Sequence, residues 1–473
     1  MQSERASAMQ IPRTCPWLSK RTPTLGALVA MLLFATLTAP VLFAQSSESD
    51  PAFKGIPFDL WIAGNDTTQI PWGISVQTPE LTDFQRLAAS ISADIPVSGL
   101  RASQGGQFFY VAQITDSRGK SYRTAGAVNI TNPLAQKTSV TVSLFFNAFL
   151  LPGDYRLALS IYDPVTERHS VAHRYFDVPR LKNDPLPDAW TNLPSVAFFS
   201  DTVLPDSQAG NLDLPLKEAR PIHIEVIANA TPTHALVPSI EVYQTNLSHL
   251  IPELEVLSQI RVNTGSVDVI ALDLENHKIA FEQDSIQTLE WQRLQDALNP
   301  KQATVVSLSS LSERSLEAKF FTGELSRRVS CGELVPGESA PDLRRVVIVI
   351  SDEMAFARDV DLSPVSTEGI CNSQVFYIRT HFLRYSYGEG SNMTSPNSDS
   401  PIAEHDGSRL NHPGVALGPN GRLPHSSLYY KSIPYEDQLE KTLAPLKPRV
   451  FEVKSPGDFR KVIASILAEA GKP

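Results

Sequence analysis

Two apolar runs that end in an acidic residue constrain the fold of this chain most. The first covers 267–273 and ends at Asp273, and the second covers 345–352 and ends at Asp352. Runs of this kind are typical of strands buried on both faces, as in a parallel sheet covered by helices. Because ligands bind at the carboxyl ends of such strands, we expect both aspartates at a functional edge of the sheet.

Around these strands, apolar residues recur at the spacing of helices. The last helix also has a clear start, because Ser455-Pro-Gly-Asp458 combines an N-cap serine, an early proline and an acid three residues on. Strands alternating with helices predict a doubly wound α/β domain over 246–473. We expect helices at Leu247/Ile251/Leu254/Leu257, Ile286/Leu289/Leu294, 315–329, Leu439/Leu443/Leu446 and from Ser455 onward, with further strands at 303–308, 374–380 and 450–453.

The two acidic strand ends resemble the von Willebrand factor A domain family. In that family an Asp-x-Ser-x-Ser motif after the first strand and a later Ser/Thr-Asp hold a magnesium ion used in ligand adhesion. Here the first motif reads Asp273-Leu-Glu275-Asn-His277, and Asp352 matches the second. Both serines are replaced, so the resemblance implies a degenerate metal site and protein binding without a cofactor.

Two alternatives to this interpretation stay open. Residues 275–278 can be a simple turn, with 278–282 returning as an antiparallel strand. Alternatively, Mg²⁺ or Zn²⁺ could bind among the acids and the histidines of this half, which would make the protein a metal-dependent hydrolytic enzyme. The histidines concerned are His277, His381, His405, His412 and His425.

The first half of the chain has the pattern of an all-β domain. Apolar residues alternate with polar ones along 140–146 and 155–161, and turn sequences separate such runs at 116–119, 151–154 and 163–168. The spacing predicts an immunoglobulin-like β-sandwich over 56–180. A connector over 181–245, containing one strand near 220–227, would join the two domains.

The N-terminus predicts export to the periplasm or the cell surface. Basic residues precede the apolar stretch 25–44, which ends in a small residue, as in a secretory signal peptide of residues 1–44. A retained membrane anchor is the alternative. Removing the signal leaves 37 Lys and Arg against 50 Asp and Glu, a net charge near −13, which disfavours nucleic acid as a partner. No later segment predicts a membrane span.

Two cysteines, Cys331 and Cys371, remain after the signal segment. An even number of cysteines in an oxidising compartment favours a disulfide, and the two flank one predicted strand. Two separate buried thiols are the alternative.

A segment rich in glycine, serine, asparagine and proline covers 383–434. Connections this long within a domain are functional or disordered in most proteins. Tyrosines bracket it, and tyrosine is enriched at binding surfaces. We therefore expect a binding loop at this insertion, with an envelope component or another protein as its partner. The bracketing residues are Tyr385, Tyr387, Tyr429 and Tyr430.

Overall fold

The computed structural model describes residues 53–96, 106–130, 141–199, 210–218, 220–231, 240–298, 314–329, 343–352, 365, 373–380 and 437–472. Over these ranges the chain is a mixed α/β protein, as the sequence predicts, and it has more strand than helix. The predicted strand 303–308, both cysteines, and the 383–434 insertion with its tyrosines lie outside the described residues.

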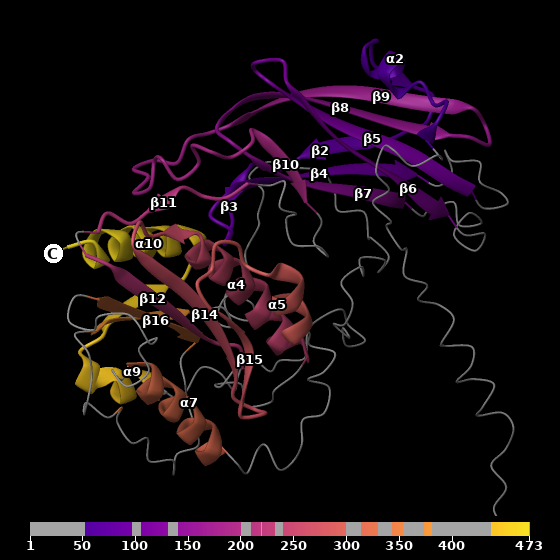
Figure 1. Cartoon of the computed structure of the whole chain (residues 1–473). Helices are drawn as coiled ribbons and strands as arrows, with labels where there is room; N and C mark the ends of the chain where they lie inside the picture. The colour runs from indigo at the N-terminus through magenta and orange to yellow at the C-terminus, as the bar shows by residue number, and fades with distance from the viewer. Residues whose placement is uncertain are drawn as a thin grey trace, which may run out of the picture.

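The N-terminal part consists of two antiparallel sheets that lie face to face (Figure 1). One sheet has the order β1-β9-β8-β5-β6, and the other has the order β10-β7-β4-β2, with β3 also paired to β4. A short helix, α2 (Phe58–Ile62), precedes them. The strands are β1 (Thr67–Thr68), β2 (Gly73–Val76), β3 (Glu80–Leu81), β4 (Leu87–Pro96), β5 (Gly106–Asp116), β6 (Ser121–Ile130), β7 (Thr141–Leu150), β8 (Gly153–Asp163), β9 (Arg168–Val178) and β10 (Val196–Phe199).

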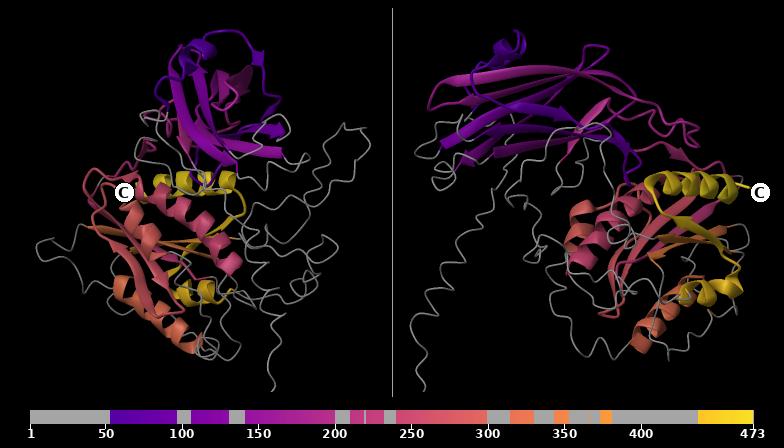
Figure 2. Two further views of the ribbon diagram at one scale, coloured as in Figure 1. Left: turned by 90° about the vertical axis from the view of Figure 1, so that its right-hand side faces the viewer. Right: turned by 180° about the vertical axis from the view of Figure 1, so that it is seen from behind.

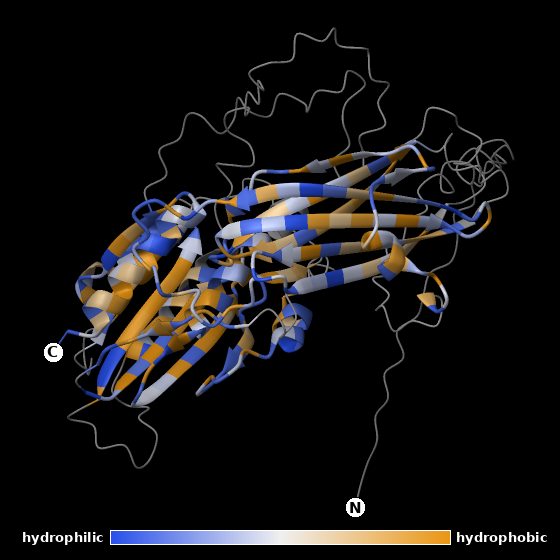
Figure 3. Ribbon diagram, turned by 90° about the horizontal axis from the view of Figure 1, so that it is seen from above, coloured by the Kyte–Doolittle hydropathy of each residue, from blue (hydrophilic) through white to orange (hydrophobic). Residues whose placement is uncertain are grey.

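The alternating sequence pattern explains these strands. Leu157, Leu159 and Ile161 of β8 are buried, and polar and apolar bands alternate along the strands of both sheets (Figure 3). Aspartates start the turns: the Asp116 carboxylate accepts hydrogen bonds from the next backbone amides, and Asp163 does the same before β9. The predicted turns at 116–119 and 163–168 are therefore confirmed as connections between paired strands, whereas 151–154 carries the chain from β7 in one sheet to β8 in the other.

The C-terminal part is built on a six-stranded sheet with the order β15-β14-β12-β16-β17-β18, parallel except for β15. The strand predicted near 220–227, within the connector, is β12. It lies at the centre of this sheet, so the α/β part begins before the predicted boundary at 246. The strands are β12 (Ile222–Asn229), β14 (Gly265–Asp273), β15 (Lys278–Gln283), β16 (Arg344–Asp352), β17 (Ser373–Thr380) and β18 (Arg449–Val453); a small separate pair joins β11 (Leu214–Pro215) to β13 (Ile260–Arg261).

Helices cover both faces of this sheet (Figure 2). On the face toward the antiparallel sheets lie α4 (Ile240–Ser258) and α10 (Pro456–Ala470), which share one apolar core with β12 and β14. On the other face lie α7 (Arg314–Val329) and α9 (Gln438–Leu443), followed by the 3₁₀ turn η7 (Ala444–Leu446). In the described part of the chain, no helix is both long and apolar enough to cross a bilayer.

One predicted helix is much shorter than expected. The spacing of Ile286, Leu289 and Leu294 predicted a single helix, but α5 covers only Trp291–Ala297. The Ile286 amide donates to the Val267 carbonyl at 2.8 Å, which holds this residue against the edge of β14. The hydrogen bond to the sheet replaces the first helical turn there. By contrast, α10 begins as predicted, with Ser455 Oγ accepting from the Asp458 amide.

Arg460 of α10 joins the two parts of the molecule. Its buried guanidinium pairs with both carboxylate oxygens of Asp184, at 2.6 and 2.8 Å, and lies 4.6 Å from the ring centre of Trp190. The Trp190 indole in turn donates to the Gln85 carbonyl. Because both charges are paired and the arginine is stacked, their burial is compensated, and the antiparallel sheets are fixed to the α/β part.

Gly265, at the start of β14, provides a test of the central sheet. Its φ is +130°, and a Cβ there would overlap the Ile222 carbonyl of β12. We expect Gly265→Ala to lower the free energy of unfolding by about 3 kcal/mol, because the strand must move or strain. Gly323→Ala on α7, where a Cβ meets nothing within 4 Å, should be neutral or stabilising. Equal stability of the two variants in denaturant unfolding would contradict this packing.

Candidate functional site

The carboxyl ends of β12, β14 and β16 form one edge of the sheet. From β12 the chain first adds strands on one side, β14 and β15, and then returns to the other side with β16, β17 and β18. A reversal of this kind is the place where open α/β sheets bind ligands. The polar residues at this edge therefore form the first candidate site.

Hydrogen bonds link the ends of the three strands. Asn229 of β12 donates through Nδ2 to Ser351 Oγ at 3.1 Å, and its Oδ1 accepts from the Thr231 amide at 2.9 Å. Thr231 Oγ1 accepts from the Leu274 amide at 2.9 Å. Ser351 Oγ donates to the Asp352 carbonyl at 2.7 Å. All of these groups are buried, so the edge has one defined arrangement.

Asp273 is engaged in its own turn. Its Oδ1 accepts from the Asn276 amide at 3.1 Å, its Oδ2 accepts from Asn276 Nδ2 at 2.7 Å, and Lys278 Nζ lies 3.6 Å from Oδ2. The chain then returns as β15, antiparallel to β14. Of the alternatives left open by the sequence, the turn between antiparallel strands is the one observed.

The four predicted metal-site positions do not come together in the structure. Glu275 and His277 lie in the same turn as Asp273; His277 has φ +50°, and its buried Nε2 has no hydrogen-bond partner. Asp352 ends β16, with β12 between it and β14, which puts two strand spacings, roughly 10 Å, between the backbones. In the described ranges no three His, Cys, Asp or Glu side chains converge as a metal site would require.

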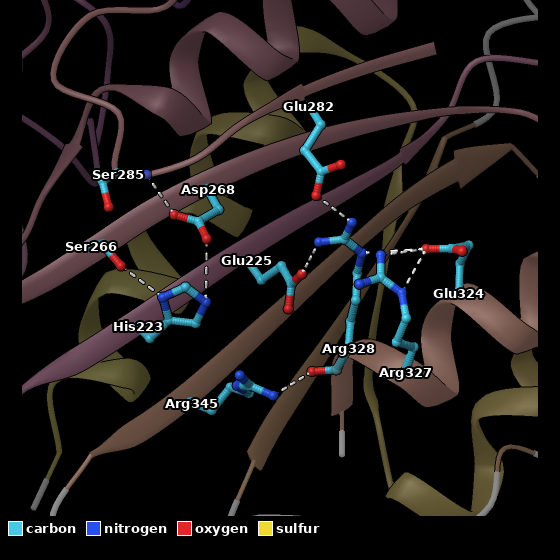
Figure 4. Close-up of polar contacts among 10 residues, drawn as sticks. All are labelled: His223, Glu225, Ser266, Asp268, Glu282, Ser285, Glu324, Arg327, Arg328 and Arg345. Atoms are coloured by element: carbon cyan, nitrogen blue, oxygen red, sulfur yellow. Dashed lines mark hydrogen bonds and ion pairs between the residues drawn. The ribbon is translucent and has the colours of Figure 1, made fainter. Parts of the chain in front are cut away.

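A second polar cluster, which the sequence analysis did not identify, lies between the sheet and α7 (Figure 4). At its centre Arg328 of α7 donates to Glu225 of β12 and to Glu282 of β15, each at 2.6 Å. Glu324 lies 3.6 Å from Arg328 Nε and also pairs with Arg327. Arg345 of β16 donates to the Arg328 carbonyl at 2.6 Å. The cluster ties α7 to three strands.

Burial and charge act in opposite directions in this cluster. Burial raises the pKa of Glu225, and the Arg328 guanidinium lowers it without cancelling the effect of burial. Burial lowers the pKa of Arg328, but the carboxylates of Glu225 and Glu282 raise it by more than burial lowers it, so the net change is upward. Arg328 therefore stays charged, and removing it would leave a desolvated carboxyl group.

His223, Ser266 and Asp268 extend the cluster along β12 and β14. His223 Nδ1 lies 2.7 Å from Ser266 Oγ, and Nε2 lies 3.5 Å from Asp268 Oδ2, whose other oxygen accepts from the Ser285 amide. Serine, histidine and aspartate are the groups of a nucleophilic triad. However, the distance from Nε2 to Oδ2 exceeds a normal hydrogen bond, so the carboxylate does not orient the ring as a triad acid does. We interpret these contacts as structural support for the sheet.

The signal for this cluster is present in the sequence but is ambiguous. His223 and Glu225 interrupt the apolar run of β12, which makes it look like a half-exposed strand. Their partners, Arg328 and Asp268, are distant in sequence. A polar residue inside a buried strand requires a partner, but its position does not identify that partner.

Comparison with known proteins does not identify a family. No family model matches the chain, and no curated protein matches it. A Bordetella pertussis protein described as ApaA is 14% identical over 24% of this chain and 97% of its own, with a TM-score of 0.17. A family 123 glycoside hydrolase from Clostridium perfringens is 10% identical over 67% and 66% of the two chains, with a TM-score of 0.24. A beta-glucuronidase from Bacteroides uniformis is 11% identical over 59% of this chain and 33% of its own, with a TM-score of 0.18. These TM-scores are too low to inform either fold or activity.

Removing Arg328 should strongly destabilise the α/β part. Because Arg328→Met leaves Glu225 desolvated, we expect a loss of about 3–5 kcal/mol in the free energy of unfolding. The double variant Arg328→Met with Glu225→Leu should recover most of this loss, because it leaves neither central charge. The neighbouring Arg327→Met is the matched control, with an expected cost below about 1 kcal/mol, since Arg327 is more exposed. Equal losses for the two arginines in chemical denaturation would refute the arrangement.

Asp273→Ala should act on stability. It removes both acceptors from the turn, and we expect a cost of about 1–2 kcal/mol with increased amide exchange over 274–278. Asp273→Asn, which keeps an acceptor for the Asn276 amide, should cost less. Stoichiometric Mg²⁺ or Mn²⁺ in the purified wild-type protein, lost on Asp273→Ala, would show instead that this residue holds a metal.

Proposed function

We propose that this chain is an exported, non-enzymatic protein that binds another protein at the carboxyl ends of β12 and β16. The observation that carries the proposal is the reversal of strand order around β12, which makes this edge the expected ligand position. Export follows from the signal-like N-terminus.

In its finer form the proposal joins an immunoglobulin-like sandwich to a von Willebrand factor A-like domain. Numbered along the chain, the six strands of the sheet lie in the order 3-2-1-4-5-6 of a doubly wound sheet, with the third strand antiparallel. Helices on both faces agree with this interpretation. The two antiparallel sheets before it support the sandwich.

The strand order also changes which residues of this chain correspond to the family motif. Asp273 ends the second strand of the sheet, whereas the family's Asp-x-Ser-x-Ser follows the first. After the first strand, β12, the sequence reads Asn229-Ala-Thr231-Pro-Thr233, which has the same spacing with asparagine for aspartate and threonine for both serines. Ser351-Asp352 stands for the later Ser/Thr-Asp pair.

The groups at this edge fit magnesium poorly. Mg²⁺ requires oxygen ligands around it and favours carboxylates. Asn229 brings no charge and turns its NH₂ group toward Ser351, and Thr231 Oγ1 already accepts from the Leu274 amide. Asp273, the acid needed by the alternative of a metal-dependent hydrolase, is used by its own turn. These contacts disfavour a bridging ion and favour a partner that contacts the chain directly around the strand ends.

The insertion belongs to the same proposal. It follows β17 in the sequence, and β17 runs parallel to β16, so its carboxyl end is at the same edge. Tyr385, Tyr387, Tyr429 and Tyr430 of this segment are then candidate contact residues.

Partner capture tests the proposal. The full mature chain is immobilised, envelope proteins are bound and identified, and the affinity of the recovered partner is measured with purified protein. Asn229 and Asp352 are buried and position the strand ends, so Asn229→Ala and Asp352→Asn should each weaken binding by roughly tenfold or more. Deletion of 388–424 should also weaken it. The exposed Glu167→Gln, on the antiparallel sheets, is the control.

A chelator separates this proposal from the metal-dependent alternative. Binding in EDTA should equal binding in Mg²⁺ if the strand ends contact the partner directly. Loss of binding in EDTA, or equal affinity of all variants and the control, would overturn the proposal.

A further inference from the structure

The turn between β3 and β4 is the part of the sandwich that lies against the α/β part. Its backbone is closed by the Thr82 amide, which donates to the Arg86 carbonyl at 2.9 Å. Gln85 Nε2 donates to the Pro456 carbonyl of α10 at 3.0 Å, and Asp83 Oδ2 lies 2.7 Å from Nδ1 of His249 on α4. This 82–86 turn therefore contacts both α4 and α10.

Glu253 of α4 lies beside this turn and is fully buried. Neither of its carboxyl oxygens has a hydrogen-bond partner. Burial raises the pKa of Glu253 well above its usual range, and the nearby Asp83 carboxylate raises it further. An ionised carboxylate without donors is very unfavourable in an apolar environment, so Glu253 is neutral when the turn is seated on α4.

Glu255 is a second buried acid at the same contact. One of its oxygens accepts from Gln259 Nε2 at 3.1 Å, and the other has no hydrogen-bond partner. Burial raises the pKa of Glu255 to about 7, although the Arg86 guanidinium of the turn lowers it. This carboxyl group therefore changes charge near neutral pH.

The other groups near Glu253 and Glu255 are mostly apolar, so the charge state of the two acids depends on pH. Among the described residues, the charged groups that act on them are Asp83 and Arg86 of the turn, and Asp83 is paired with His249 of α4. Toward α4 the sheet presents apolar side chains, and Arg460 of α10 is paired with Asp184. The apolar side chains are Ile222, Ile224, Val226 and Ala228 of β12 and Val267, Val269 and Ala271 of β14.

We propose that the contact between the 82–86 turn and α4 is a proton-operated latch, closed when Glu253 and Glu255 are protonated and loosened when they ionise. The direction follows from linkage: the seated form holds protons that the open form releases, so raising the pH favours opening. For Glu255 the loss of stability develops between pH 4.5 and about 7, and for Glu253 it also begins near pH 4.5 and extends well above the usual range of a glutamate.

The latch can act on the strand ends through α4. Asn246 of α4 donates through Nδ2 to the Ala230 carbonyl at 3.2 Å, directly after β12. Movement of α4 at the turn would therefore reach the residues that follow Asn229. This link rests on the proposed function, but the latch itself does not.

Hydrogen exchange and thermal unfolding of the full chain from pH 4.5 to 9 test the latch. Protection of the 82–86 turn and of 246–258 should fall as pH rises, and the melting temperature should fall by roughly 2–4 °C per pH unit for each ionising acid. Glu255→Gln should remove the part of this fall between pH 4.5 and about 7, Glu253→Gln should remove a further part, and the double variant should show little pH dependence. The exposed Glu167→Gln is the control for loss of charge alone.

Direct titration keeps the test decisive if a variant does not fold. Carboxyl ¹³C shifts of the wild-type protein should show that Glu253 ionises well above the usual range of a glutamate, and Asp83→Asn should lower the pH at which it ionises. Titration of Glu253 at an ordinary glutamate pKa would overturn the proposal. So would a double variant that keeps the pH dependence of the wild type. None of these measurements involves partner binding. Failure of the latch and failure of the proposed function can therefore be distinguished.

Discussion

The α/β part depends on the position of β12 between β14 and β16. Parallel hydrogen bonds on both sides make it the centre of the sheet, and its two faces carry different chemistry. Ile224 and Val226 pack toward α4, whereas Glu225 faces Arg328 on α7. The end of the same strand positions Asn229 against Ser351. One strand thus determines the core, the buried ion pair and the candidate binding edge.

Buried charge recurs at each place where separate elements meet. Arg328 ties α7 to β12 and β15, and Arg460 ties α10 to Asp184. Both arginines meet carboxylates directly, and these pairs offset much of the cost of desolvation. At the 82–86 turn, by contrast, the acids Glu253 and Glu255 keep oxygens without a partner. The arginine contacts are therefore permanent supports, whereas the contact at the turn responds to protons.

Much of the fold was predictable because periodicity is a local signal. The alternation in β8, the buried run of β14 and the capping serine of α10 each identified its element. The role of β12 was not predictable in this way, because His223 and Glu225 break the apolar pattern and only distant partners justify their burial. The predicted helix does not begin at Ile286 for a related reason, because a hydrogen bond from Ile286 to β14 competes with the first helical turn.

The sequence predicted that the candidate site lies at the carboxyl ends of parallel strands, but it did not predict the strand order. Asp273 and Asp352 do lie at the carboxyl ends of parallel strands. Sequence order alone did not show that a strand before residue 246 lies between them, nor that Asp273 is used by its own turn. Asn229 and Thr231 carry no acidic signal, so their place at the edge emerges only from the strand order.

The most direct test of the account is a hydrogen-exchange footprint of the full chain with its bound partner. The account predicts added protection at 229–231, 274–277 and 351–352, the segments at the carboxyl ends of β12, β14 and β16. Protection confined to the strands of the two antiparallel sheets, with these segments unchanged, would contradict it.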